Sequence, residues 1–208
     1  MMLQKIKNIV EYEITGRDYL KPYQDDILHI SNKLTKSFML GNRLYICGNG
    51  GSSADASHIA SEFIKDFNIK RIATNKAKDY PSNKIQGKLQ KGFPAFSLSD
   101  PAIITAISND IDYSLIYAQQ IYAYGNVGDV LILLSTSGNS ENVINAAITA
   151  SEIGVYTICF TGKKENELHN LCSYGVKVDY PTTARIQEGY MSILHTVCAV
   201  VEKIIYQM

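Results

Sequence analysis

The chain has 208 residues, of which 46% are hydrophobic and 19% charged, the composition of a globular protein with a sizeable apolar core. Its 20 basic and 20 acidic residues cancel, so no net charge favours a nucleic acid or a membrane surface as partner. Apolar runs such as Val130–Leu134 are far too short to cross a bilayer, and residues 1–10 lack the apolar region of an export signal. We therefore expect a cytoplasmic protein that contacts neither nucleic acid nor membrane.

Residues 1–40 are predicted to form two N-terminal helices, because apolar residues recur at helical spacing through Ile27, Ile30 and Leu34. The pattern changes after Gly41. Residues 43–47 read as a short strand, and residues 48–51 form a glycine turn. A helix is then expected over residues 54–66, with Ser52 or Ser53 as its N-cap.

Residues 67–93 interrupt this regular alternation. The segment from Lys65 to Lys91 contains eight basic residues against only Asp66 and Asp79. We interpret it as an inserted, solvated surface loop. A gate over the site, or a contact with a partner, is the alternative.

The remaining chain alternates strands and helices. Strands are expected at 94–98, 130–134, 156–160 and 176–178, and helices at 102–108, 113–123, 141–153 and 185–205. This alternation predicts one α/β domain over residues 1–208, a doubly wound parallel sheet flanked by helices. Ligands of such folds bind at the carboxyl ends of the strands.

The four cysteines show no CxxC spacing, and two of them end apolar strand-like runs. We interpret all four as reduced thiols that fill the core of a cytosolic protein, rather than as metal ligands. They are Cys47, Cys159, Cys172 and Cys198.

The turn after residues 130–134 carries four hydroxyls and a glycine at a strand-to-helix junction. Hydroxyls and free N–H groups at a helix start suit an anion, and Gly138 allows close approach. The chain has neither a P-loop lysine nor a GxGxxG sequence, so a phosphomonoester fits better than a nucleotide. The alternative is an ordinary N-cap with extra serines. The hydroxyls belong to Ser135, Thr136, Ser137 and Ser140.

The glycine turn of residues 48–51 also suits ligand binding. Its glycines permit close approach to the sheet edge, while Asn49 and Ser52 offer hydrogen bonds to sugar hydroxyls or phosphate. A tight connection alone would need only one glycine.

Four further side chains suit metal binding or proton transfer. His58 and Glu62 share a helix face four residues apart, and Gln187 and His195 share a stripe of the last helix. Imidazole and carboxylate groups bind Zn²⁺ and also serve as general acids and bases. On its own, such a pair is more often a surface or packing pair. Its position directly after a ligand-type turn favours a function.

Together these motifs resemble those of the phosphoheptose isomerases, members of the sugar isomerase (SIS) domain proteins. The resemblance rests on Cys47-Gly48-Asn49-Gly50-Gly51-Ser52 with Asp55, His58 and Glu62, on residues 134–140, and on Arg185-Ile186-Gln187-Glu188 with His195. It covers nearly the whole chain except residues 67–93. It implies conversion of sedoheptulose 7-phosphate to D-glycero-D-manno-heptose 7-phosphate through an enediol, for lipopolysaccharide or capsule.

The resemblance also implies roles for particular residues. Glu62 and His195 would transfer protons, and His58, Glu62, Gln187 and His195 would bind one zinc ion per site. It implies a homotetramer with sites between subunits. The substrate would contact Asn49, Gly50, Gly51, Ser52, Glu62, Gln187, the pair Asn109 and Asp110, and the phosphate-binding Ser135, Thr136, Ser137 and Ser140.

One departure from the family pattern keeps an alternative open. Ala184 stands where the family has an acidic residue before Arg-Ile-Gln. A related branch of the fold includes a non-catalytic protein that binds a replication initiator. Ala184 is compatible with such a non-catalytic protein, whereas Glu62, Gln187 and both histidines favour an enzyme. An isomerase of another sugar phosphate is the other alternative.

Overall fold

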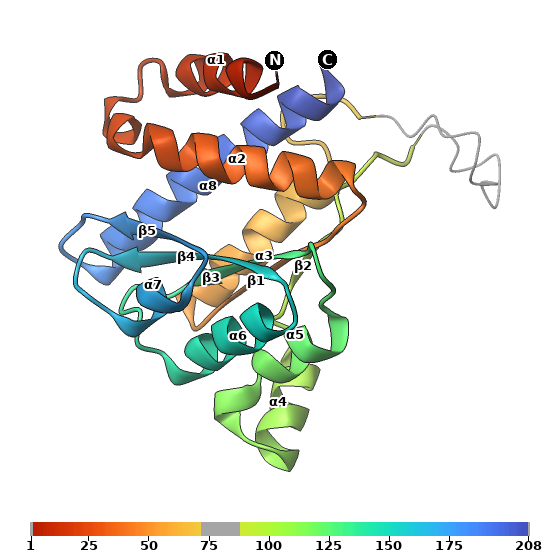
Figure 1. Ribbon diagram of the computed structural model, residues 1–208, viewed down its shortest axis with the longest axis vertical. Coiled ribbons are helices and arrows are strands. Elements are labelled where there is room, and N and C mark those ends of the chain that lie inside the picture. The colour runs from red at the N-terminus through yellow and green to blue at the C-terminus, as the bar shows by residue number, and fades with distance from the viewer. Residues whose placement is uncertain (1, 72–87, 208) are drawn as a thin grey trace.

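The computed structural model of the chain describes residues 2–71 and 88–207. At its centre is a five-stranded, all-parallel sheet of order β2-β1-β3-β4-β5 (Figure 1). Residues 72–87, the middle of the predicted insertion, lie outside the described residues. The strands are β1 (Leu44–Gly48), β2 (Ala95–Ser97), β3 (Val130–Leu134), β4 (Tyr156–Gly162) and β5 (Tyr174–Val178).

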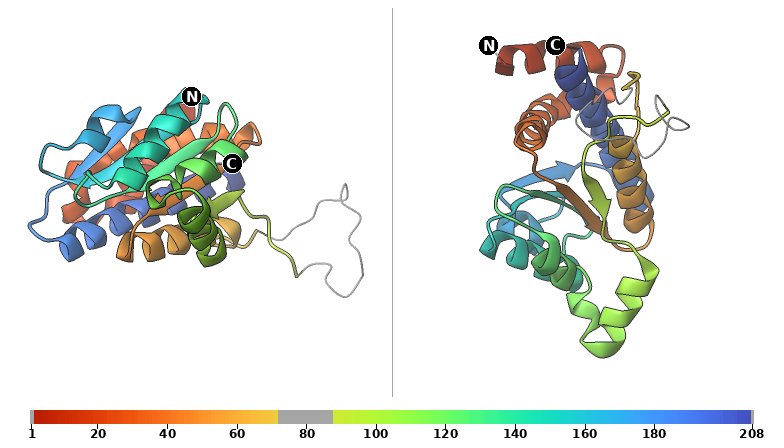
Figure 2. Two further views of the ribbon diagram at one scale, coloured as in Figure 1. Left: turned by 90° about the horizontal axis from the view of Figure 1, so that it is seen from below. Right: turned by 90° about the vertical axis from the view of Figure 1, so that its right-hand side faces the viewer.

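Helices cover both faces of the sheet (Figure 2). On one face lie α2 (Gln24–Met39), α3 (Gly51–Ile64) and α8 (Thr183–Tyr206), with α1 (Met2–Ile14) packed outside α2 and α8. On the other lie α5 (Ala118–Tyr124), α6 (Glu141–Glu152) and α7 (Glu167–Leu171). Helix α4 (Pro101–Asp110) projects from this side, and short 3-10 helices form at η1 (Asp18–Tyr23) and η2 (Tyr113–Leu115).

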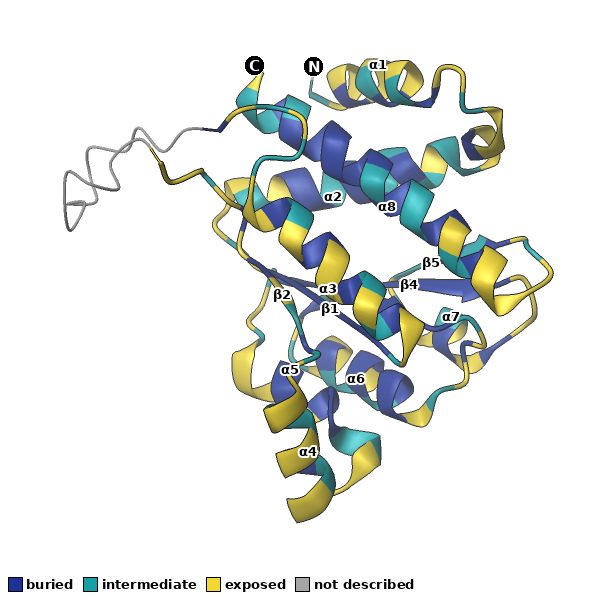
Figure 3. Ribbon diagram, turned by 180° about the vertical axis from the view of Figure 1, so that it is seen from behind, coloured by how far each residue is buried: buried dark blue, intermediate teal, exposed yellow. Residues whose placement is uncertain are grey.

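Side chains along each buried strand point alternately to the two faces of the sheet, so the core has two parts. In β3, Val130, Ile132 and Leu134 pack with α2, α3 and α8, whereas Leu131 and Leu133 pack with α5, α6 and α7. Every residue of β1 and β3 is buried, as expected for central parallel strands whose two faces are both covered (Figure 3). The predicted doubly wound α/β fold is confirmed.

The register of β1 and β3 places two loops side by side. Gly48 and Leu134, the last residues of these strands, are paired across the sheet. The glycine turn after β1 therefore lies next to the hydroxyl-rich loop after β3, at the carboxyl edge where ligands of such sheets bind.

Two local predictions were wrong, and one helix was missed. Neither Ser52 nor Ser53 caps α3, because the helix begins one turn earlier, at Gly51, with Gly50 as N-cap. The helix predicted over 113–123 is divided into η2 and α5, since the Asp112 side chain accepts from Ser114 N and caps a single turn. The short helix α7 was not predicted; the Asn166 side chain caps it by accepting from His169 N.

Candidate active site

The glycine turn brings α3 and α8 into close contact. A Cβ atom on Gly51 would lie 2.7 Å from Gln187 Nε2, so a larger residue here would displace the Gln187 amide. Next to it, Ser52 is buried, and its hydroxyl lies 2.9 Å from Tyr190 Oη and accepts a 3.4 Å hydrogen bond from Gln187 Nε2. Gly50, with φ 57°, turns the chain from β1 into the helix.

Asn49 is held in place by neighbours from two other helices. Its side-chain amide exchanges hydrogen bonds of 2.8 and 3.0 Å with the amide of Asn142 on α6. Tyr117 Oη donates to Gly48 O at 2.5 Å and lies 3.1 Å from Asn49 Oδ1. Sequence reasoning missed both partners, because an asparagine inside a helix and a buried tyrosine carry no distinctive local signal.

The loop of residues 135–140 is organised by its own hydroxyls. Ser135 Oγ accepts from Gly138 N at 3.1 Å and lies 3.3 Å from Ser140 Oγ. Ser140 occupies the N-cap of α6 but makes no side-chain cap, so its hydroxyl does not compete with a ligand for the first N–H groups of the helix. Such a helix start favours an anion.

A cavity of about 640 Å³ opens beside this loop. Thr136 and Ser137 line it on one side, and the segments that follow β4 and β5 close the other. Lys163 and Lys164 line it as well, although Lys163 is ion-paired with Asp179 at 2.7 Å. Sequence reasoning missed the two lysines; their position immediately after the strand run could have indicated them.

A carboxylate and two imidazoles meet where α3 and α8 pack side by side (Figure 3). His58 Nε2 lies 3.3 Å from Glu62 Oε1 and 3.4 Å from His195 Nε2. The second carboxylate oxygen of Glu62 accepts a 2.6 Å hydrogen bond from Lys65 Nζ. Burial lowers the pKa of His195, and the adjacent His58 lowers it further. His195 is therefore a neutral imidazole at neutral pH, able to take up a proton.

Gln187 stands apart from this cluster. It precedes His195 by eight residues, about 12 Å along the axis of α8, and its amide points to Ser52. In the described ranges, no three His, Cys, Asp or Glu side chains gather into a ready metal site. The two contacts of His58 nonetheless match the separation of about 3.4 Å between ligand atoms in a tetrahedral zinc site with bonds of about 2.0–2.1 Å.

Asn109 and Asp110 are exposed at the end of α4, where Asn109 Nδ2 donates to Asp110 Oδ1 at 2.8 Å. Figure 1 shows α4 projecting away from α3 and α8. Within one chain, this pair is not brought to the cluster of His58, Glu62 and His195.

The start of the predicted insertion packs against α8 through two of its side chains. The side chain of Arg71 is fully buried, and its Nε lies 2.9 Å from Glu202 Oε1 on α8. The ring of Phe67 stacks on His195, with ring centroids 6.0 Å apart. The interpretation as a solvated loop was therefore wrong for Arg71, whose charge a buried carboxylate on α8 compensates, whereas Asn68 and Lys70 are exposed.

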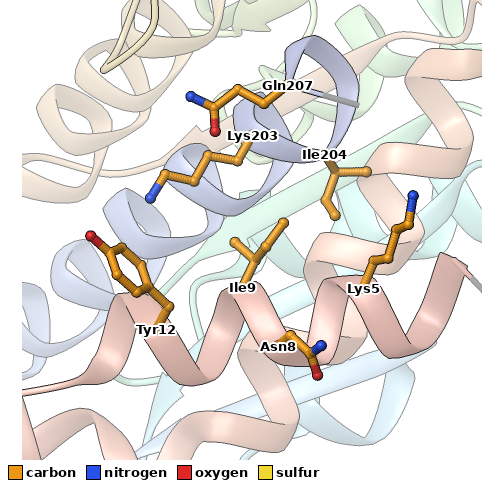
Figure 4. A pocket seen from close by; sticks show the side chains of 7 residues that line it. All are labelled: Lys5, Asn8, Ile9, Tyr12, Lys203, Ile204 and Gln207. Atoms are coloured by element: carbon orange, nitrogen blue, oxygen red, sulfur yellow. The ribbon is translucent and has the colours of Figure 1, made fainter.

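A second cavity, of about 450 Å³, lies between α1 and the end of α8 (Figure 4). Lys5, Tyr12, Lys203 and Gln207 are among the residues that line it. None of the residues selected from the sequence lines this cavity. The loops at the carboxyl edge of the sheet are therefore the better candidate.

Comparisons with known proteins identify the family of the chain. The family model of the SIS domain matches residues 88–162. A phosphoheptose isomerase of Clostridium acetobutylicum is 37% identical over 206 residues, covering 95% of each chain. One of Aneurinibacillus thermoaerophilus is 36% identical over 206 residues, covering 99% of this chain and 92% of its own. The solved structure of a phosphoheptose isomerase from Francisella tularensis matches with a TM-score of 0.75 at 26% identity, covering 98% of this chain and 99% of that one. The chain belongs to the phosphoheptose isomerase family.

Proposed function

We propose that the protein is an aldose–ketose isomerase that converts sedoheptulose 7-phosphate to D-glycero-D-manno-heptose 7-phosphate. The family membership of the chain supports this reaction, and the product would serve heptose synthesis for lipopolysaccharide or capsule. The observation that carries the proposal is that His58 lies against both Glu62 and His195. These three side chains lie where α3 and α8 pack together, and α3 begins at the glycine turn.

In this mechanism the phosphate is a remote handle. Ser135, Thr136, Ser137 and Ser140 bind it, together with the first N–H groups of α6. Held there, the sugar presents its first two carbons to the reacting groups in a fixed orientation, which replaces a costly loss of freedom at the moment of reaction. Asn49, Gly50, Gly51 and Ser52 contact the sugar at the adjoining turn, and Gln187 reaches it from α8.

Proton transfer falls to Glu62 and His195. Glu62 removes a proton from carbon 1 of the ketose, which forms a cis-enediol, and returns a proton to carbon 2. His195 moves a proton between the two oxygens, so that no atom is gained or lost overall. The support for these roles is that Glu62 is only 14% exposed and that burial keeps His195 neutral.

We propose a zinc ion at the same place, held by His58, Glu62 and His195, with Gln187 as a fourth ligand after rotation of its side chain. When bound, zinc would polarise the carbonyl oxygen as a Lewis acid. The donor chemistry and the two distances from His58 support this assignment. Metal analysis tests it, because His58→Ala should lose zinc that the unaltered chain retains.

We further propose a cytoplasmic homotetramer. The support is the position of Asn109 and Asp110 on the projecting helix α4. A neighbouring subunit could bring this pair to the sugar, whereas the chain's own α4 does not. Light scattering of the purified chain tests the subunit number.

The deciding experiment replaces Glu62 by Gln, which keeps the shape of the side chain but removes the base. Turnover of sedoheptulose 7-phosphate should fall by about 100-fold or more, while binding of the sugar phosphate stays measurable. Glu152→Gln, a surface change at the end of α6, is the matched control and should keep full activity. Near-normal turnover of Glu62→Gln would refute the assignment.

A further inference from the structure

Two cysteines meet beneath the short helix α7. Cys159 is fully buried in β4, and Cys172 is half-buried immediately after the last residue of α7. The thiol of Cys159 and the backbone N–H of Cys172 both approach the carbonyl oxygen of Leu168, at 3.8 and 3.2 Å. The two thiols therefore lie close together in the fold, and each changes the pKa of the other. A disulfide between them requires the two sulfur atoms to approach to about 2.05 Å.

The two thiols differ in reactivity. The hydrogen bond from Cys159 lowers the pKa of the Cys172 thiol, although burial opposes the effect. The thiolate is the form that attacks an oxidant. Cys172 is also the more exposed of the two, so it is the sulfur that a small oxidant reaches more readily.

Helix α7 connects this thiol pair to the loop of residues 135–140. At its N-terminal end, Leu168 N donates to Gly138 O at 3.1 Å, and Glu167 N donates to Asn139 Oδ1 at 3.3 Å. Asn166 lies directly against Gly138, where a Cβ atom would come within 2.1 Å of its Oδ1. Because α7 has only five residues, its two ends, next to Cys172 and next to the loop, are separated by only about 8 Å.

We propose that Cys159 and Cys172 form a reversible disulfide on exposure to a hydroperoxide, and that α7 transmits its closure to the loop of residues 135–140. The Cys172 thiolate attacks the peroxide, and with one proton this gives a sulfenic acid and water (or the alcohol). The Cys159 thiol then displaces a second water as the S–S bond forms. Two thiols are thus oxidised by two electrons, and the peroxide is reduced. A dithiol reductant reverses the reaction.

Hydrogen peroxide followed by peptide mapping without reductant tests the disulfide in the intact chain. A cross-link between the peptides of Cys159 and Cys172 is expected, and dithiothreitol should remove it. Cys159→Ser should abolish the cross-link and leave Cys172 as sulfenic or sulfinic acid. Buried Cys198, on the other face of the sheet, is the internal control and should stay reduced. The absence of the cross-link, or a cross-link through Cys47 or Cys198 instead, would overturn the proposal.

The link to the loop is tested on the same samples by amide hydrogen exchange, which needs no ligand. Oxidation should accelerate exchange at Leu168 N, whose acceptor belongs to the loop; unchanged exchange would overturn the coupling. Inorganic phosphate should also bind about three- to tenfold more weakly to the oxidised chain, the equivalent of one lost hydrogen bond. This last measurement rests on the proposed function. If the reduced chain binds no phosphate while the cross-link and the exchange change are present, the phosphate assignment fails and the thiol proposal stands.

Discussion

The carboxylate of Glu202 joins the segment after α3 to the last turns of α8. Its Oε1 accepts from Phe67 N at 2.9 Å and lies 2.9 Å from Arg71 Nε. Its Oε2 accepts from Asn68 N at 2.7 Å and from Ile69 N at 3.1 Å. The exposed fraction of the side chain is 1% for Glu202 and 0% for Arg71. One buried carboxylate therefore compensates both a guanidinium and three backbone donors.

Glu202→Gln should destabilise the fold by about 3 kcal/mol. The change removes the negative charge opposite Arg71 and replaces one accepting oxygen by a donor that faces other donors. Loss of one partner of a buried ion pair costs about 3–5 kcal/mol. The lower end applies, because the Nε of Arg71 is not aimed at the oxygen for a hydrogen bond and Asp66 remains 3.6 Å from it.

Urea unfolding at one fixed protein concentration measures this difference and keeps any effect of subunit association constant. Glu188→Gln is the matched control. It removes a still shorter contact, 2.6 Å to Arg185, but both side chains are more than half exposed, and such pairs contribute about 0–1 kcal/mol. If Glu202→Gln costs no more than Glu188→Gln, the buried carboxylate does not hold this segment and the reasoning is refuted.

Two further substitutions test other parts of the structure. Gly138→Ala should lower the free energy of unfolding by about 2 kcal/mol or more, because the added Cβ meets both a positive φ of 67° and the side chain of Asn166. Gly16→Ala, with φ 75° and no atom within 4 Å of the added Cβ, should lower it by only about 1 kcal/mol. Urea unfolding measures both, and equal costs would contradict the Asn166 contact. Burial lowers the pKa of His29; Asp26 opposes this shift, and Lys33 adds to it. The stability that this imidazole contributes is therefore complete above its unfolded pKa of about 6.5 and is lost as the pH falls below that value. His29→Phe should therefore reduce the decline in unfolding free energy between about pH 7.5 and 5, and an unchanged decline would contradict this account.

The sequence was most informative where one local rule determines the structure. The run Val130–Leu134 is apolar on both faces, as a central parallel strand must be, and its predicted bounds agree with those of β3. The glycine turn and the hydroxyl loop were also placed correctly at the carboxyl ends of strands, whereas the pairing of those two strands came from the structure. The family follows from the same motifs, because they lie in the parts of the chain that fold locally.

The errors arose where distant residues decide the structure. Glu202 was not singled out from the sequence, although it interrupts an apolar stretch that includes Val200, Val201 and Ile204, and this interruption was the available signal. Its partner Arg71 lies 131 positions earlier in the chain, in what appeared to be a polar loop. The orientation of Gln187 likewise depends on how closely Gly51 allows α3 to approach α8. The spacing of residues in the sequence does not determine the distance between α3 and α8.

The central claim is that Glu62 and the imidazoles next to it carry a proton between two carbons of a phosphorylated sugar. Incubation of the purified chain with sedoheptulose 7-phosphate in deuterium oxide, followed by nuclear magnetic resonance, tests it directly. The account predicts an aldose heptose 7-phosphate with deuterium at carbon 2, formed by the unaltered chain and not by Glu62→Gln. A chain that binds the ketose but forms no aldose, with or without added zinc, would contradict it.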